Sequence, residues 1–131
     1  DNYNVRIIKK KDVASSTSRE DNLVVAITSG QFGQGSRELG ESLMKSFIYA
    51  LTEVSPKPKT LIFINAGVHF TTEGSSVQDS LKALESEGVE IMSCGACLNF
   101  YGLTDKLIIG SISNMYSIVE KLNKASNTIK V

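Results

Sequence analysis

The sequence is poor in the residues that build metal centres and disulfide frameworks. It has two cysteines and one histidine among 131 residues, with two prolines and no tryptophan. A secreted disulfide scaffold normally carries more cysteines, and a structural zinc site normally takes four cysteine or histidine ligands. We therefore expect no disulfide framework and no structural metal centre, and no sequence feature indicates a cofactor.

The sequence also lacks the charge excess and the long apolar runs that mark two classes of partner. Fourteen basic and fourteen acidic residues cancel, whereas a protein that grips nucleic acid needs surplus basic residues to neutralise phosphates. No apolar run approaches the ~20 residues of a membrane-spanning helix. The start of the chain is polar and basic rather than apolar, unlike a signal peptide. These absences predict a cytoplasmic protein without nucleic-acid or membrane partners.

The chain divides into a short first segment and one domain. Tyr3, Val5 and Ile7 alternate with polar residues, which predicts one strand within residues 1–11. Residues 12–22 are charged and rich in serine without periodicity, as linkers are. Residues 23–131 have the length and hydrophobic content of a single domain.

Within that domain, apolar runs alternate with helical patterns. The predicted strands are residues 23–27, 61–64, 89–92, 107–109 and 128–131. Several of these runs are apolar on both faces, as the strands of a covered parallel sheet are. The alternation with helices predicts an α/β fold in three layers, with a mostly parallel sheet of about five strands between helices.

Three helices are expected between these strands. An apolar stripe of Leu39, Leu43, Phe47 and Leu51, with Met44 and Ile48 beside it, predicts the first. Ser75 and Gln78 form a candidate capping box for the second, which Gly88 would end. Asn114 or Ser113 would cap the third, whose apolar positions are Met115, Ile118, Val119 and Leu122.

The residues with reactive side chains fall in loops that follow strands. Ligands of open α/β sheets bind beyond the carboxyl ends of the strands, which selects residues 29–35, 65–74 and 93–102. Both cysteines and the single histidine lie in these loops. The candidate pocket residues are Gly33, Gly35, Asn65, Gly67, His69 and Gly95. The glycines equally suit permissive turns, Asn65 a turn closed by its side chain, and His69 an ordinary polar position or a proton donor.

Cys94-Gly95-Ala96-Cys97 is the strongest chemical signal in the sequence. It follows a predicted strand, and a short helix from it would end at Gly102. Backbone N–H groups at a helix start lower a thiol pKa, and a thiolate is the form that attacks sulfur. Three functional interpretations are open: thioredoxin-like exchange, metal binding with ligands from another subunit, and a sulfur relay. Two cysteines packed as small apolar residues remain the structural alternative.

Four segments together resemble a known family: residues 35–51, 63–68, 93–103 and 113–116. Over roughly residues 23–131 the chain resembles the C-terminal DsrE-like domain of the YedF family, which are sulfurtransferase-like proteins of selenium metabolism. Residues 1–11 resemble the last strand of the TusA-like domain that precedes it in that family. The resemblance therefore implies that residues 1–22 are the tail strand and linker of a preceding domain.

The resemblance also implies a function. DsrE-like proteins have a parallel sheet between helices, assemble as dimers, trimers or hexamers, and in several cases carry a persulfide on a cysteine after the third strand. That cysteine corresponds to Cys94, with Cys97 as an additional thiol. The resulting hypothesis is a sulfur or selenium relay in which Cys94 attacks a donor and Cys97 releases the chalcogen by forming a disulfide.

The partners that this hypothesis implies are further copies of the chain and a sulfur or selenium donor or acceptor protein. Its own TusA-like domain is one candidate for that protein. The rival interpretation is a non-catalytic module that binds a ligand or supports assembly, in which both cysteines are merely packed.

Overall fold

The computed structural model describes residues 22–131, so the strand expected within residues 1–11 lies outside the described part, as does almost all of the expected linker. The strands are β2 (Leu23–Ile27), β3 (Thr60–Phe63), β4 (Glu90–Cys94), β5 (Ser111–Ser113) and β6 (Asn127–Lys130). The α-helices are α2 (Arg37–Leu51), α3 (Gln78–Ser86), α4 (Gly95–Phe100) and α5 (Met115–Lys124). Two 3-10 helices, η2 (Asn65–Thr71) and η3 (Thr104–Lys106), complete this part of the chain.

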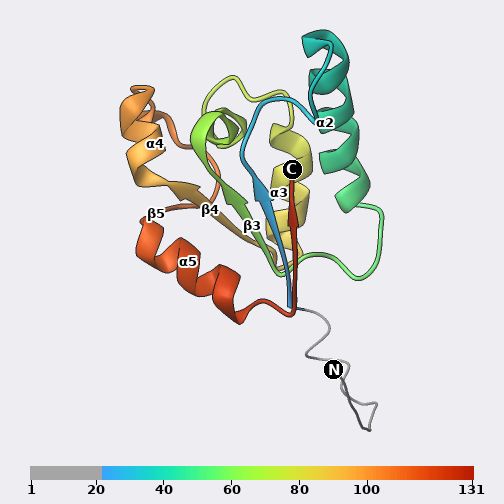
Figure 1. Cartoon of the computed structure of the whole chain (residues 1–131), viewed down its shortest axis with the longest axis vertical. Helices are drawn as coiled ribbons and strands as arrows, with labels where there is room; N and C mark the ends of the chain where they lie inside the picture. Colours follow the sequence, from blue (N-terminus) through green and yellow to red (C-terminus); the bar gives the residue numbers. More distant parts are fainter. Residues whose placement is uncertain (1–21) are drawn as a thin grey trace, which may run out of the picture.

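The five strands form one sheet in the order β5-β4-β3-β2-β6, and every pair is parallel. Figure 1 shows the sheet between α5 on one side and α2 with α3 on the other. The predicted α/β fold with a parallel sheet between helices is therefore confirmed. Because all strands are parallel, their carboxyl ends meet at one edge of the sheet.

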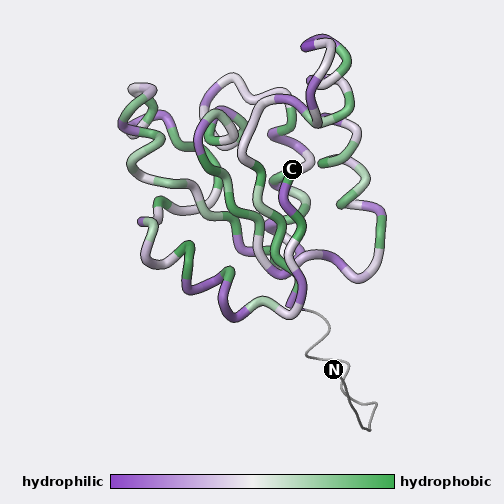
Figure 2. The backbone as a smooth tube through the Cα atoms, in the orientation of Figure 1, coloured by the Kyte–Doolittle hydropathy of each residue, from purple (hydrophilic) through white to green (hydrophobic). Residues whose placement is uncertain are grey.

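The two faces of the sheet are covered unequally. Beneath α2 and α3 lies the larger core, built around Val25, Ile27, Met44, Ile48, Leu61, Phe63, Leu81, Leu84 and Ile91. Within residues 22–131 the opposite face has one covering helix, α5, whose single fully buried residue, Ile118, packs among Val24, Ile62, Met92 and Cys94. Figure 2 shows that the central strands are strongly hydrophobic along their length, as strands buried on both faces are.

Helix α2 buries only part of the predicted apolar stripe, namely Met44, Ile48 and Leu51. Its buried residues are Gly40, Met44, Ile48 and Leu51, whereas Leu39 is 57% exposed and Leu43 is 42% exposed. The preceding loop explains this orientation, because Phe32 donates a backbone hydrogen bond to the Gly40 carbonyl. A Cβ atom at Gly40 would lie 2.8 Å from Cβ of Gln31, so this close contact holds the first turn of α2 against the loop.

The sequence analysis placed the last strand before α5 at residues 107–109, and this prediction was wrong. Residues 107–109 form no strand of the sheet; Leu107 makes an isolated antiparallel bridge with Thr72, and Ile109 is buried in the larger core. The sheet is extended instead by β5, which is mostly polar and pairs with β4. The apolar run is thus buried as irregular chain, which periodicity cannot distinguish from a short strand.

Helix ends were predicted with mixed success. Asn114 caps α5, its Oδ1 accepting from the Ser117 N–H at 2.9 Å. Gly88 follows α3 with φ +96°, and Gly102 follows α4 with φ +70°, as helix-ending glycines do. The capping box at Ser75 was wrong, because α3 begins after Val77 without a side-chain cap and Ser75 Oγ accepts from the Val77 N–H.

Candidate functional site

The two cysteines lie where β4 ends and α4 begins. Cys94 has extended backbone angles as the residue before α4, and its side chain, 3% exposed, packs in the smaller core beneath α5. Cys97 is half-buried one turn later and contacts both cores. Both are free thiols, and Cys97 packs against the smaller core that contains Cys94. The strand, short helix and paired thiols follow the sequence prediction.

Gly95 allows α4 to start close to the edge strand. A Cβ atom there would lie 3.0 Å from Ile112 Cγ2 and 3.3 Å from the Ser113 carbonyl oxygen. A larger residue would therefore push the first turn of α4 away from β5. The role of Gly95 is to let the turn that carries both thiols pack against the sheet.

Asn65 joins the end of β3 to the cysteine pair. Its backbone N–H donates to Cys97 Sγ at a nitrogen–sulfur distance of 3.0 Å, and its Oδ1 accepts from the Tyr101 hydroxyl at 2.8 Å. Its φ of +55° is left-handed, a conformation that asparagine tolerates better than most residues. This turn at the carboxyl end of β3 directs the N–H at the sulfur.

Tyr101 and His69 extend this cluster. The two rings meet edge to face with centroids 4.7 Å apart, and His69 Nδ1 lies 3.0 Å from the Ala66 carbonyl oxygen. The sequence analysis selected Asn65 and His69 but missed Tyr101. Its position one helical turn after Cys97 was the available signal.

The ionisation of Cys97 differs from the prediction. Burial raises the pKa of the Cys97 thiol above its ordinary value of 9.0, and the contact with Cys94 raises it further. The Asn65 N–H opposes this rise by stabilising the thiolate. The prediction that the helix start would lower this pKa was wrong for Cys97, because desolvation outweighs the donors around the sulfur.

The remaining predicted pocket residues are structural or distant from the thiols. Gly33 and Gly35 have φ of +82° and +137° in an exposed turn with open space around them. Gly67 is buried, and a Cβ atom there would lie 2.2 Å from the Ile27 carbonyl oxygen. Its missing side chain allows η2 to rest on the end of β2.

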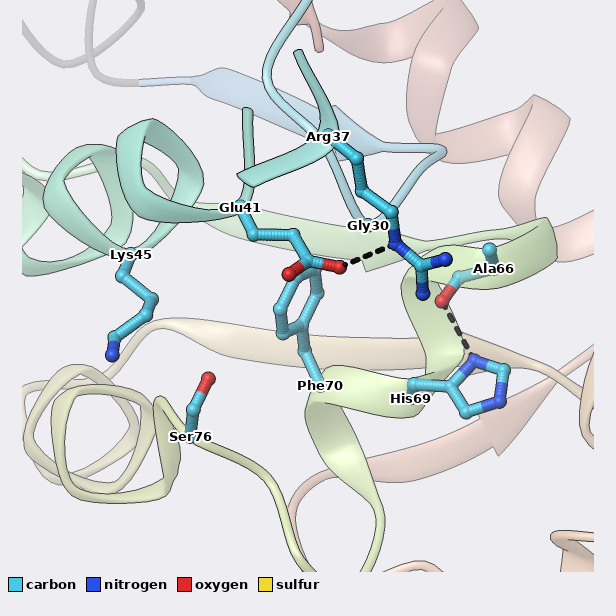
Figure 3. A pocket seen from close by; sticks show the side chains of 8 residues that line it. All are labelled: Gly30, Arg37, Glu41, Lys45, Ala66, His69, Phe70 and Ser76. Atoms are coloured by element: carbon cyan, nitrogen blue, oxygen red, sulfur yellow. Dashed lines mark hydrogen bonds and ion pairs between the residues drawn. The ribbon is translucent and has the colours of Figure 1, made fainter. Parts of the chain in front are cut away.

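A cavity of about 540 Å³ lies between α2 and the segment from η2 to the start of α3 (Figure 3). It is lined by Gly30, Arg37, Glu41, Lys45, Ala66, His69, Phe70 and Ser76. His69 is the one predicted pocket residue among them, and neither cysteine contributes. Sequence reasoning missed the charged residues of α2, although their spacing of four places them on one helix face.

Across residues 22–131, no three histidine, cysteine, aspartate or glutamate side chains come together to hold a metal ion. A metal at the cysteine pair would therefore need ligands from elsewhere. No helix in the same range is long and apolar enough to cross a membrane.

Comparison with known proteins identifies the family of this chain. Residues 21–131 match the DsrE/DsrF-like family. The chain belongs to the DsrE/DsrF-like family. A search of curated proteins finds no significant match to this DsrE/DsrF-like chain.

Solved structures agree with the DsrE/DsrF-like fold. The ychN protein from E. coli superposes with a TM-score of 0.67 at 16% identity, covering 85% of this chain and 99% of its own. MTH1491 from Methanobacterium thermoautotrophicum, titled a protein of unknown function, gives 0.60 at 18% identity, with coverage of 83% and 97%. BT1422 from Bacteroides thetaiotaomicron, also titled of unknown function, gives 0.59 at 14% identity, with coverage of 91% and 100%. At these identities the likeness concerns the fold alone.

Proposed function

We propose that this domain relays sulfur or selenium through Cys94 and Cys97, as a member of the YedF branch of its family. The observation that carries the proposal is the cluster at the carboxyl edge of the sheet: two neighbouring free thiols with the Asn65 N–H directed at one sulfur. A donor aimed at sulfur stabilises the thiolate or persulfide anion that chalcogen transfer requires.

The solvent exposure of the two thiols indicates which of them reacts first with a donor. Cys97 is half-buried and Cys94 is 3% exposed, so a donor approaching from solvent meets Cys97 first. In this scheme the Cys97 thiolate attacks the outer sulfur of a donor persulfide, forms a persulfide on Cys97 and releases the donor as a thiol. This order is the reverse of the one that the family resemblance implies, in which Cys94 makes the first attack.

Release follows from the proximity of the second thiol. The Cys94 thiolate attacks the inner sulfur of the Cys97 persulfide, forming the Cys94–Cys97 disulfide and expelling hydrosulfide. Two thiols are thereby oxidised while the carried sulfur is reduced, so a dithiol reductant must restore the pair for another cycle. The reducing cytoplasm, the compartment we propose, supplies such reductants.

We also propose that the relay domain works as a homo-oligomer. Large apolar side chains stay exposed along α4, β5 and α5: Phe100 at 82%, Tyr116 at 77%, Met115 at 53% and Ile112 at 48%. These elements share one side of the molecule, the side covered by a single helix (Figure 1). Exposed apolar residues of this size favour association with another copy of the chain. We propose a sulfur or selenium donor or acceptor protein, such as a TusA-like domain, as a second partner.

Intact-protein mass spectrometry after incubation with glutathione persulfide tests the relay. The wild-type chain is expected to gain one sulfur atom and then release hydrosulfide as the disulfide forms. Cys94→Ser is expected to gain sulfur at the wild-type rate and to retain it, because the second thiol is missing. Cys97→Ser is expected to gain sulfur much more slowly.

The two cysteine variants serve as controls for each other. If Cys97→Ser gains sulfur at the wild-type rate and Cys94→Ser does not, the order implied by the resemblance holds and the order proposed from exposure is wrong. If the Cys94→Ser/Cys97→Ser double variant takes up sulfur as fast as wild type, the pair is no relay.

A non-catalytic binding module is the second candidate. The raised pKa of Cys97 and the burial of Cys94 favour it, because both reduce thiol reactivity near neutral pH. The two functions differ in a thiol titration. Alkylation of Cys97 by iodoacetamide in the native chain supports the relay, whereas two thiols that react only after unfolding support the module.

A further inference from the structure

The cavity between α2 and η2 carries an excess of positive charge that the cysteine chemistry does not use. Arg37, Glu41 and Lys45 succeed one another every four residues along one face of α2 and all line it. His69 and Phe70 of η2 form the opposite wall (Figure 3). Two cations against one carboxylate leave the lining positive, with a volume of about 540 Å³ that suits a small molecule.

The two cations are not fully neutralised within the molecule. Glu41 Oε2 accepts from Arg37 Nε at 3.0 Å, and Figure 3 shows the terminal nitrogens of the guanidinium directed toward Ala66 and His69. Lys45 forms no ion pair with any side chain in residues 22–131. Among residues 22–131, the Lys45 ammonium therefore has no anionic partner, and the Arg37 guanidinium keeps terminal N–H groups that are not used by Glu41.

A second hollow adjoins the first at Lys45. Its volume is about 340 Å³, and it shares Lys45 and Ser76 with the larger cavity. The rest of its lining is rich in hydroxyl groups, from Ser46, Tyr49 and Ser80, beside Val77. Lys45 of α2 thus lies between a charged compartment beside η2 and a hydroxyl-lined compartment beside the start of α3.

We propose that these adjoining hollows form a binding site for a small organic anion, a phosphate ester or carboxylate of a hydroxylated compound. Lys45 and the terminal guanidinium nitrogens of Arg37 hold the anionic group, and the hydroxyl-lined compartment receives the rest of the ligand. Phe70 supplies an apolar wall. Neither cysteine lines the site, so the cysteine pair makes no direct contact with the ligand.

The negative charge of Glu41 allows a test in which the direction of the change in affinity distinguishes an anionic ligand from a cationic one. Its carboxylate repels an anion and occupies one donor of Arg37. Removing that charge in Glu41→Gln is expected to tighten binding of an anion. A ligand that carried an amino group would show the opposite effect, because it would lose its anionic partner.

The experiment is a titration of the ¹⁵N-labelled chain followed by NMR, with glycerol 3-phosphate as the probe and glycerol as the neutral match. Amide shifts are expected around Gly30, Lys45, Ala66 and Ser76 with glycerol 3-phosphate, and none there with glycerol. Lys45→Gln is expected to weaken binding roughly fivefold and Glu41→Gln to tighten it roughly threefold, which are effects typical of partly exposed charges. These side chains are exposed, so the variants fold as wild type does.

Lys82→Gln is the matched control, since Lys82 is an exposed lysine of α3 that lines neither hollow. It is expected to leave the dissociation constant unchanged. The proposal is overturned if Lys82→Gln weakens binding as much as Lys45→Gln, if Glu41→Gln weakens it, or if shifts scatter over all lysines. Sulfur uptake by the Cys97 thiol is not read out here, so this result and that of the relay test are separable.

Discussion

At the scale of single residues, the balance at Cys97 decides what the thiol pair can do. Its sulfur accepts a backbone hydrogen bond from Asn65 and packs against both cores of the domain. The first contact lowers the pKa of the thiol, and the burial raises it by more. Near neutral pH the protonated thiol therefore dominates, and deprotonation becomes easier when the sulfur is more hydrated.

This raised pKa predicts how stability depends on pH. In the unfolded chain Cys97 has its ordinary pKa of 9.0, and in the folded domain its pKa is higher. Below the unfolded pKa both states hold the proton, so stability is unaffected. As pH rises from the unfolded pKa through the folded pKa, the unfolded state loses its proton first, and the free energy of unfolding falls.

Urea unfolding near pH 7 and near pH 10, under reducing conditions, measures this effect. Wild type is expected to lose more stability over the interval than Cys97→Ser, which lacks the titrating thiol. All other side chains are common to the two proteins, so the difference between them reports on Cys97. An equal loss in both proteins would show that Cys97 ionises alike in the folded and unfolded states.

The sequence could place these residues together but could not predict their burial. Because parallel strands share a carboxyl edge, the sequence alone selects Cys94, Cys97, Asn65 and His69. Whether a sulfur faces solvent depends on how α4 turns against the cores, which involves contacts far apart in the chain. Tyr101 was missed for the same reason, because its hydroxyl reaches Asn65 across 36 positions.

At the scale of elements, η2 is fixed by its approach to β2. Gly67 of η2 leaves room for the Ile27 carbonyl oxygen, which a Cβ atom would approach to 2.2 Å. The same oxygen accepts from the Ile64 N–H, so the junction of β2, β3 and η2 is tight. Because the obstructing atom belongs to the backbone, the neighbour has little freedom to move aside.

Gly67→Ala is therefore expected to lower the free energy of unfolding by about 3 kcal/mol, as overpacking at a rigid site does. Gly30→Ala is the control, because a Cβ atom there has nothing within 4 Å and the residue has no positive φ. Chemical denaturation of both variants measures the difference. Comparable stability of the two would mean that η2 shifts without cost.

Elements with strong local signals were predicted well from the sequence, and those selected by tertiary contacts were not. The central strands are apolar on both faces, and Asn114, Gly88 and Gly102 mark helix ends through local backbone chemistry. Helix α2 has apolar residues on more than one face. The contact between its first turn and the preceding loop determines which face is buried. The edge strand β5 pairs with β4 although its sequence is polar.

At the scale of the whole molecule, the unequal covering of the sheet predicts self-association. In the described part of the chain, α5 alone covers the face that carries Cys94, and Tyr116 of that helix is 77% exposed. Sedimentation velocity is expected to show an assembly of more than one chain, which Tyr116→Glu dissociates because a charge would be buried at the contact. Tyr49→Glu, at a residue 59% exposed on α2, is expected to leave the assembly intact.

A monomeric wild-type chain at micromolar concentration would contradict this prediction. So would dissociation of the assembly by Tyr49→Glu as readily as by Tyr116→Glu. A monomeric chain would mean that the exposed apolar residues bind a different partner. Dissociation by Tyr49→Glu would place the contact between chains on the face of α2.

The short helix η2 contacts both the cysteine pair and the cavity beside α2. Asn65 at one end of η2 touches the Cys97 sulfur, while Ala66 and His69 of the same short helix line the anion cavity. A ligand that displaced η2 would alter the Asn65 donor and with it the acidity of Cys97. Thermodynamic reciprocity then requires that the charge state of Cys97 change the affinity of that ligand by the same factor.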